Sequence, residues 1–312
     1  MSDRALHQKP LFAGMSKVRL DRIASLYFFH PLSRAFGTRS KPRVPILMYH
    51  GIREDARTGH PYYETNTSRR VFALQMKYLR EYGYQALDLE TATRSLQQGG
   101  RLEKSVVITF DDGYRDFYTI AYPILKENKL SATVFLVARF TTDQGTRVNG
   151  KQFMTWSQVR ELNSGGIRFG SHTLNHPQLK FLTAPEVDEE VGRSKRTIED
   201  KIGSPVRSFS YPFAFPETER AFISNLKNTL QRHGYKNGVS TIIGTAGSND
   251  DRFFLPRLPV NSFDDLRFFR AKLEGGYDWL HFPQQLYKRL KPNLPRIRGI
   301  GRHRDVAEHP GP

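Results

Sequence analysis

The sequence contains no cysteine among its 312 residues. This absence excludes disulfide bonds and thiolate metal ligands, so any zinc site must be built from His and Asp side chains. It also leaves the redox compartment undetermined.

Long hydrophobic runs and phosphate-binding loops are also missing. No stretch of 18 apolar residues occurs, so a membrane-spanning helix is not expected. The first residues lack the uninterrupted apolar segment and the small-residue cleavage site of a secretory signal peptide, which makes a cytoplasmic location the default expectation. A Gly-rich phosphate loop of either common type is absent, and this weighs against nucleotide chemistry.

Acidic residues are few relative to basic ones, and the formal net charge is +17. Residues 1–43 contribute +7 and residues 285–312 contribute +5, so twelve of the seventeen charges lie near the ends. The central part is only modestly basic, which argues against a specific nucleic-acid substrate. Within 16–36, basic and apolar residues alternate with helical spacing. This pattern favours a segment that packs on the barrel or is loosely ordered, with peripheral contact to an anionic membrane as the alternative.

Strand and helix signals alternate through the central part, whose composition is apolar enough to bury a core. Helices are indicated by caps such as Thr183-Ala-Pro-Glu186, a capping box that opens a helix running to about Ile202. About seven β-then-α units favour an α/β barrel of parallel strands over a doubly wound sheet. Strands are predicted at residues 44–49, 84–87, 106–110, 132–137, 167–171 and 207–211, with two weaker ones around 239–242 and 253–255.

The predicted strand 106–110 ends in Asp111, Asp112 and Gly113. Two neighbouring carboxylates repel each other, and a bound metal ion is the commonest group that offsets this repulsion. The same residues would also suit a simple turn and helix cap, so this motif alone does not decide.

Two histidines provide the second motif. His172 and His176 follow the predicted strand 167–171 and are four residues apart. On one helical turn, this spacing would put both imidazoles on the same side. Two imidazoles and one carboxylate suit zinc and leave a coordination position open, as in catalytic zinc sites. A surface position is the better explanation for either histidine alone.

Together these motifs resemble those of a known family. Thr109-Phe-Asp-Asp-Gly113 and Ser171-His-Thr-Leu-Asn-His176 are similar, in order and separation, to the first two motifs of the polysaccharide deacetylases, the NodB-homology carbohydrate esterases. The similarity extends from about residue 45 to about residue 269. It implies a distorted (β/α) barrel that removes acetyl groups from N-acetylated sugars with one divalent metal ion, for which Zn²⁺ is expected.

The resemblance also implies roles for single residues. Asp112, His172 and His176 would hold the metal ion, and Asp111 would be the general base that takes a proton from water. The resulting hydroxide would attack the acetamide carbonyl.

Ser208-Phe-Ser-Tyr-Pro-Phe-Ala214 resembles the third motif of the family, commonly Arg-x-Pro-(Tyr/Phe)-Gly. Phe213 takes the place of the residue whose backbone N–H stabilises the oxyanion. Ser210 stands where the arginine would be and Ala214 where the glycine would be, so the base lacks an expected partner. A turn with two core aromatics is the alternative interpretation.

A further residue comes from the first predicted strand. Met-Tyr-His50-Gly resembles the entry strand of the poly-N-acetylglucosamine deacetylases, in which such a histidine lies in the active site. His50 is therefore the preferred acid or substrate-positioning group. His281 competes for this role, although an ordinary surface position suits it better. Arg257, in Leu-Pro-Arg-Leu-Pro, is the remaining residue expected near the site.

These observations predict a basic leader (1–43), a NodB-homology catalytic domain (44–275) and a basic tail (276–312). The predicted function is metal-dependent N-deacetylation of a polymeric or lipid-linked glycan. A non-carbohydrate amidase, a non-catalytic glycan-binding homologue and a nucleic-acid binder are the rival hypotheses.

Overall fold

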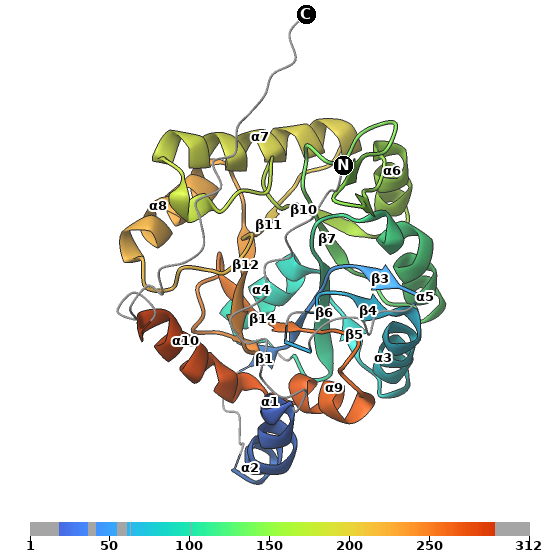
Figure 1. Cartoon of the computed structure of the whole chain (residues 1–312), viewed down its shortest axis with the longest axis vertical. Coiled ribbons are helices and arrows are strands. Elements are labelled where there is room, and N and C mark those ends of the chain that lie inside the picture. The colour runs from blue at the N-terminus through green and yellow to red at the C-terminus, as the bar shows by residue number, and fades with distance from the viewer. Residues whose placement is uncertain (1–18, 37–41, 55–60, 63, 101, 291–312) are drawn as a thin grey trace, which may run out of the picture.

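The computed structural model of the protein describes residues 19–36, 42–54, 61–62, 64–100 and 102–290. Its centre is a closed barrel of seven parallel strands in the order β2-β14-β12-β11-β10-β7-β6, in which β6 pairs again with β2 (Figure 1). β5 extends the sheet beside the start of β6. The bounds are β2 Ile46–Tyr49, β5 Gln85–Ala86, β6 Ser105–Phe110, β7 Thr133–Leu136, β10 Arg168–Ser171, β11 Ser208–Ser210, β12 Asn237–Ile243 and β14 Leu255–Pro259. The predicted α/β barrel is confirmed.

Helices surround the barrel and follow its strands in the chain (Figure 1). Side chains cap two of them at the start: Ser68 accepts a hydrogen bond from the Val71 N–H and Asp88 accepts one from the Thr91 N–H. These helices are α3 Arg69–Glu81, α4 Leu89–Gln98, α5 Tyr122–Glu127 with the π-turn Phe117–Ala121 before it, α6 Trp156–Ser164, α7 Ala184–Ile202, α8 Arg220–Arg232 and α9 Leu266–Leu273.

One predicted helix begins later than expected. The apolar periodicity indicates a helix from Ser262, but α9 begins at Leu266 because Asp265 is its cap and accepts a hydrogen bond from the Phe268 N–H. The Ser262 hydroxyl instead accepts a hydrogen bond from the Ser68 N–H, at the start of α3.

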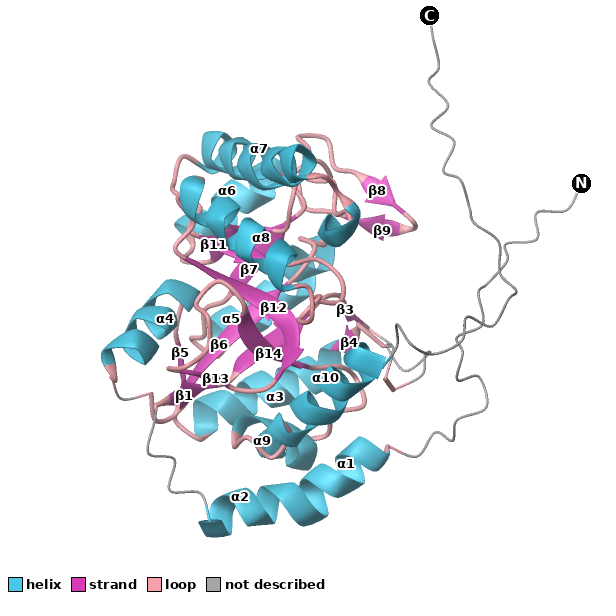
Figure 2. Ribbon diagram, turned by 90° about the vertical axis from the view of Figure 1, so that its left-hand side faces the viewer, coloured by secondary structure: helices cyan, strands magenta, loops and turns pink. Residues whose placement is uncertain are grey.

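Three short pairs of strands lie outside the barrel sheet in the described part of the chain. β1 Arg43–Val44 pairs with β13 Ala246–Gly247, and β3 Ile52–Arg53 pairs with β4 Thr67–Ser68. A hairpin of β8 Arg147–Val148 and β9 Lys151–Gln152 lies on the same side of the molecule as β3 and β4 (Figure 2). These short pairs are absent from the sequence-based prediction, because two-residue strands carry no periodicity.

The described part of the leader is helical and packs on the body. It consists of α1 Leu20–Ala24, the π-turn Ser25–Phe29 and α2 His30–Phe36, and the π-turn packs against α9 (Figure 2). Its Asp21 accepts a hydrogen bond from the Tyr277 hydroxyl, and the Ser25 hydroxyl accepts one from the Trp279 indole. Residues 1–18 lie outside the described residues.

The segment predicted as a basic tail is helical in its first part. The 3₁₀ turn Asp278–Leu280 leads into α10 His281–Leu290, and Asp278 accepts hydrogen bonds from both the backbone and the hydroxyl of Thr245. The packed body therefore extends beyond residue 275, and residues 291–312 lie outside the described part. No helix among the described residues is both long and apolar enough to cross a membrane.

Candidate active site and metal centre

The polar residues of the motifs gather at one end of the barrel. β2, β6, β10 and β11 run parallel, so their carboxyl ends lie at the same edge. His50 directly follows β2, Asp111 and Asp112 follow β6, His172 follows β10, and the third motif follows β11. The barrel thus brings together groups that are far apart in the sequence.

The turn after β6 requires unusual backbone angles. Asp112 has a φ of 73° and Gly113 one of 77°, both in the left-handed region. Aspartate tolerates this region better than most residues, whereas a Cβ on Gly113 would lie 2.6 Å from Cδ2 of Leu136. This glycine therefore fixes the close packing that turns Asp112 toward the histidines.

The three predicted ligands form one cluster. The Oδ1 atom of Asp112 lies 3.6 Å from Nε2 of His172 and 3.4 Å from Nε2 of His176, and the two Nε2 atoms are 3.2 Å apart. The edge of a tetrahedron with metal–ligand bonds of about 2.1 Å is roughly 3.4 Å. The chemistry and spacing of the three side chains therefore fit a small divalent cation such as Zn²⁺.

The segment from His172 to His176 is a loop, so the predicted helical turn is wrong. Thr173 and His176 have φ values of 70° and 59°, which no helix contains. Glu190 of α7 stabilises the loop by accepting hydrogen bonds of 2.9 Å from the N–H groups of Leu174 and Asn175. The histidines converge because this buried carboxylate folds the loop, and helical spacing plays no part.

Hydrogen bonds orient the ligands. The Nδ1–H of His172 donates to the carbonyl oxygen of Ser210 at 2.8 Å, which leaves Nε2 as the free lone pair of that ring. The nearby Tyr114 side chain helps to lower the pKa of the Asp112 carboxyl.

The protonation states also suit metal binding. Burial, together with the charge of neighbouring His172, lowers the pKa of His176 to about 4. Burial raises the pKa of Asp112, but the nearby His50 and His172 outweigh it and lower this pKa overall. A neutral imidazole and an ionised carboxylate at neutral pH are the forms that bind a cation.

Asp111 has an arginine partner that the third motif does not supply. Burial raises the pKa of Asp111, but the Arg257 charge outweighs it and holds this pKa far below its usual range. The two Nη atoms of Arg257 donate to the two carboxylate oxygens at 2.8 and 2.7 Å. Ser210, at the position where the family has arginine, donates to Asp111 at 3.2 Å. The arginine therefore comes from β14, and it holds the Asp111 carboxylate although position 210 is serine.

We expect Arg257→Met to lower the free energy of unfolding by about 3–5 kcal/mol, because it leaves the fully buried Asp111 without its counter-charge. Urea denaturation would measure this loss. The double variant Asp111→Asn/Arg257→Met should lose less, since it buries no unpaired charge.

The matched control is Arg94→Met, which removes an exposed arginine paired with Glu90 on α4. It should change the unfolding free energy by about 1 kcal/mol or less. Equal losses in Arg257→Met and Arg94→Met would contradict the assigned role of the buried pair.

The remaining predicted residues lie in different places. His50 is close enough to Asp111 and Asp112 for their charges to raise its pKa, although burial is the larger effect and lowers it overall. The ring of Phe213 lies 4.6 Å from that of His176, between centroids. His281 instead lies at the start of α10, with its Nε2 atom 3.3 Å from Glu217.

The third motif presents a backbone N–H at the site edge. Phe213 has a φ of 59°, and its N–H has no acceptor among the described residues. The left-handed residue of this turn is Phe213, so alanine at position 214 needs no glycine-like conformation.

Sequence reasoning missed the roles of Glu190 and Tyr114. A signal existed for Glu190, which shares the apolar face of α7 with Val187 and Val191. An acidic residue on a buried helix face needs buried partners. No such signal marks Tyr114.

Comparisons with known proteins agree with this site. The family model described as polysaccharide deacetylase matches residues 98–238. The Bacillus subtilis protein YxkH, whose name describes it as a candidate polysaccharide deacetylase, is 32% identical over 239 residues, covering 76% of this chain and 78% of YxkH. A poly-β-1,6-N-acetyl-D-glucosamine N-deacetylase of Escherichia coli is 33% identical over 140 residues, which cover 41% of this chain but 20% of that relative.

A solved structure is also similar. The Streptococcus pyogenes deacetylase PplD, in complex with acetate, superposes with a TM-score of 0.66 at 26% identity, covering 75% of this chain and 99% of PplD. The superposed region thus spans most of this chain and nearly all of PplD. From the extent of the match to YxkH, and with the motifs assembled at one end of the barrel, it follows that this chain belongs to the polysaccharide deacetylase family.

Proposed function

We propose that the protein is a metal-dependent N-deacetylase that hydrolyses the acetamido groups of an N-acetylated glycan in surface polysaccharide metabolism. One observation supports this most: the cluster of Asp112, His172 and His176 lies at the barrel end beside an ionised, buried Asp111. The names of the relatives, which describe deacetylation of polysaccharides, support the same reaction.

The chain supplies groups for each step. A divalent ion, Zn²⁺ by preference, held by Asp112, His172 and His176 would supply Lewis acidity and lower the pKa of water at the site. Asp111 accepts the proton of the attacking water, whose oxygen bonds to the acetamide carbon. The N–H of Phe213 donates to the carbonyl oxygen as it gains charge. His50, whose lowered pKa leaves its ring neutral, passes the proton that Asp111 took from water to the departing amine when the C–N bond breaks, and acetate is released.

The test is acetate release from a panel of N-acetylated glycans by protein reconstituted with a divalent metal. Release from glycans supports the proposal. Release from simple amides alone would favour the amidase hypothesis, and glycan binding without release would favour a non-catalytic homologue. Binding of nucleic acid with a steep salt dependence, without acetate release, would support the hypothesis of a nucleic-acid-binding protein.

We expect His50→Ala to lower kcat by about 10²-fold or more while metal content is retained, because the variant loses a proton donor without losing a ligand. His281→Ala is the matched control and should keep its rate, since His281 contacts Glu217 outside the cluster. A normal rate in His50→Ala, beside an inactive but metal-loaded His281→Ala, would reverse the assignment.

We further propose that the leader helix contacts an anionic membrane surface. Its outer side exposes large apolar side chains: Leu20 (65%), Ile23 (41%), Tyr27 (59%), Phe28 (67%) and Leu32 (51%). The same helix carries the exposed Arg34, and the ends of the chain hold most of its positive charge. An apolar helix face with flanking basic residues is typical of peripheral membrane binding.

We expect Tyr27→Ser/Phe28→Ser to weaken binding to phosphatidylglycerol-containing vesicles by about tenfold or more, because two aromatic side chains no longer enter the interface. Co-sedimentation with the vesicles would measure the bound fraction of each protein. Leu74→Ser is the control, since Leu74 is exposed on α3. Equal binding by both variants and the unaltered protein would contradict the proposal.

A further inference from the structure

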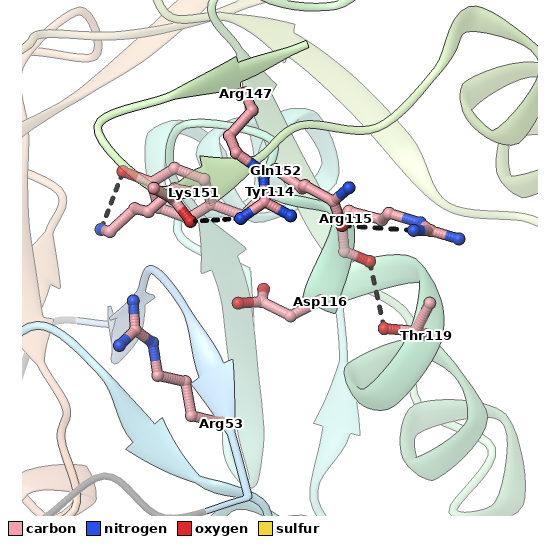
Figure 3. Close-up of a pocket in the computed structure, with 9 residues that line it drawn as sticks. Arg53, Tyr114, Arg115, Asp116, Thr119, Arg147, Lys151 and Gln152 are labelled. Carbon is pink, nitrogen blue, oxygen red and sulfur yellow. Dashed lines mark hydrogen bonds between the residues drawn. The ribbon is translucent and has the colours of Figure 1, made fainter. Parts of the chain in front are cut away.

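A pocket of about 470 Å³ begins at Tyr114, two residues after Asp112, and none of the sequence motifs accounts for it (Figure 3). Three segments line it. β3 provides Arg53, the segment after Gly113 provides Tyr114 to Asp116, and the β8–β9 hairpin provides Arg147 and Lys151. Its volume is within the range of small-ligand sites, which starts at about 300 Å³.

The pocket is strongly cationic. Three arginines and one lysine line it, against the single carboxylate of Asp116. Within the described residues, none of the three arginines has an ion pair with a carboxylate. Arg115 donates to the side-chain oxygen of Gln152 at 3.2 Å, and Arg147 donates to the carbonyl oxygen of Gly150 at 3.3 Å. These guanidinium groups keep further donors for an anionic ligand, because each carries five N–H groups.

Tyr114 connects this pocket to the metal cluster. Its hydroxyl accepts a hydrogen bond of 2.9 Å from Nζ of Lys151, and its backbone follows the proposed ligand Asp112 by two residues, through the turn at Gly113. The wall of the pocket is therefore close to the cluster of Asp112, His172 and His176. A glycan whose acetamido group reaches the cluster would place a neighbouring sugar over the pocket.

We propose that this pocket is an anion subsite that selects glycans with a carboxylate or phosphate on a sugar next to the acetamido sugar. The inference rests on the proposed function and narrows its substrate class. Planar guanidinium groups bind carboxylate and phosphate with two parallel hydrogen bonds, so Arg53, Arg115 and Arg147 match either group. A neutral sugar would leave these charges without a partner.

The experiment compares three matched N-acetylated oligosaccharides: one neutral, one with a uronic acid carboxylate and one with a phosphate on the neighbouring sugar. We expect kcat/KM for at least one anionic substrate to exceed that for the neutral one by about tenfold, the effect of one charge-assisted hydrogen bond. Whichever anionic substrate is preferred identifies the source of the charge. In Arg53→Gln/Arg147→Gln this ratio should fall toward one.

Arg94→Gln is the control, since Arg94 is exposed on α4 and pairs with Glu90 outside the pocket. It should keep the ratio of the unaltered protein. Equal kcat/KM for all three substrates, or an unchanged ratio in the double variant, would overturn the subsite.

A separate readout distinguishes failure of the subsite from failure of the proposed function. Calorimetry with the three deacetylated oligosaccharides measures binding without catalysis. If no acetate is released but an anionic oligosaccharide binds preferentially, the deacetylase function is refuted and the anion subsite is supported. If acetate is released but no anionic oligosaccharide is preferred, the deacetylase function is supported and the anion subsite is refuted.

Discussion

Asp111→Asn should reduce acetate release by about 10²-fold or more while the protein keeps its metal ion. Asp111 adjoins Asp112, which we propose as a metal ligand, yet the two oxygens of Asp111 accept hydrogen bonds from Arg257. The asparagine has nearly the same shape but cannot take a proton from water. Rates on an N-acetylated oligosaccharide, with metal content measured on the same samples, would show the loss.

The control for this variant is Ser210→Ala, which removes one hydrogen bond to Asp111 but leaves both contacts to Arg257. It should lower the rate far less than Asp111→Asn does. Because asparagine leaves Arg257 with a weaker partner, folding of the variant must be checked by denaturation. A folded, metal-loaded Asp111→Asn protein with an ordinary rate would show that another residue is the base.

Removal of the metal ion should abolish measurable acetate release, and added Zn²⁺ should restore it. Lewis-acid stabilisation contributes several kcal/mol to such a reaction, which corresponds to about 10³-fold or more in rate. Replacement of Asp112, His172 and His176 by alanine should lower the bound metal from one ion per chain to none.

Thermal unfolding gives a second readout that is independent of activity. A bound ion raises the Tm of the native protein, so Zn²⁺ should raise the Tm of the unaltered chain but not that of the triple variant. His233→Ala is the matched control, because His233 is a histidine that pairs with Asp188 away from the site. Unchanged metal stoichiometry in the triple variant would rule out this ligand set.

Local signals in the sequence determined most of the fold. The buried run of β6 and caps such as Ser68 and Asp88 act within a few residues, so alternation of strands and helices can be read directly. Parallel strands joined in this way put their carboxyl ends at one edge, which is why the sequence also predicts that His50, Asp111 and His172 converge.

The tertiary structure decided how these groups are held. Arg257 contacts Asp111, which lies 146 positions earlier in the sequence, and Glu190 folds the histidine loop from a helix that begins after it. The hairpin that completes the cationic pocket is likewise placed by the barrel. Such contacts depend on burial and on the closure of the barrel, which bring distant side chains to within hydrogen-bonding distance. Sequence spacing reports only neighbours along one strand or helix, so it could suggest Arg257 near the site but could not pair it with Asp111.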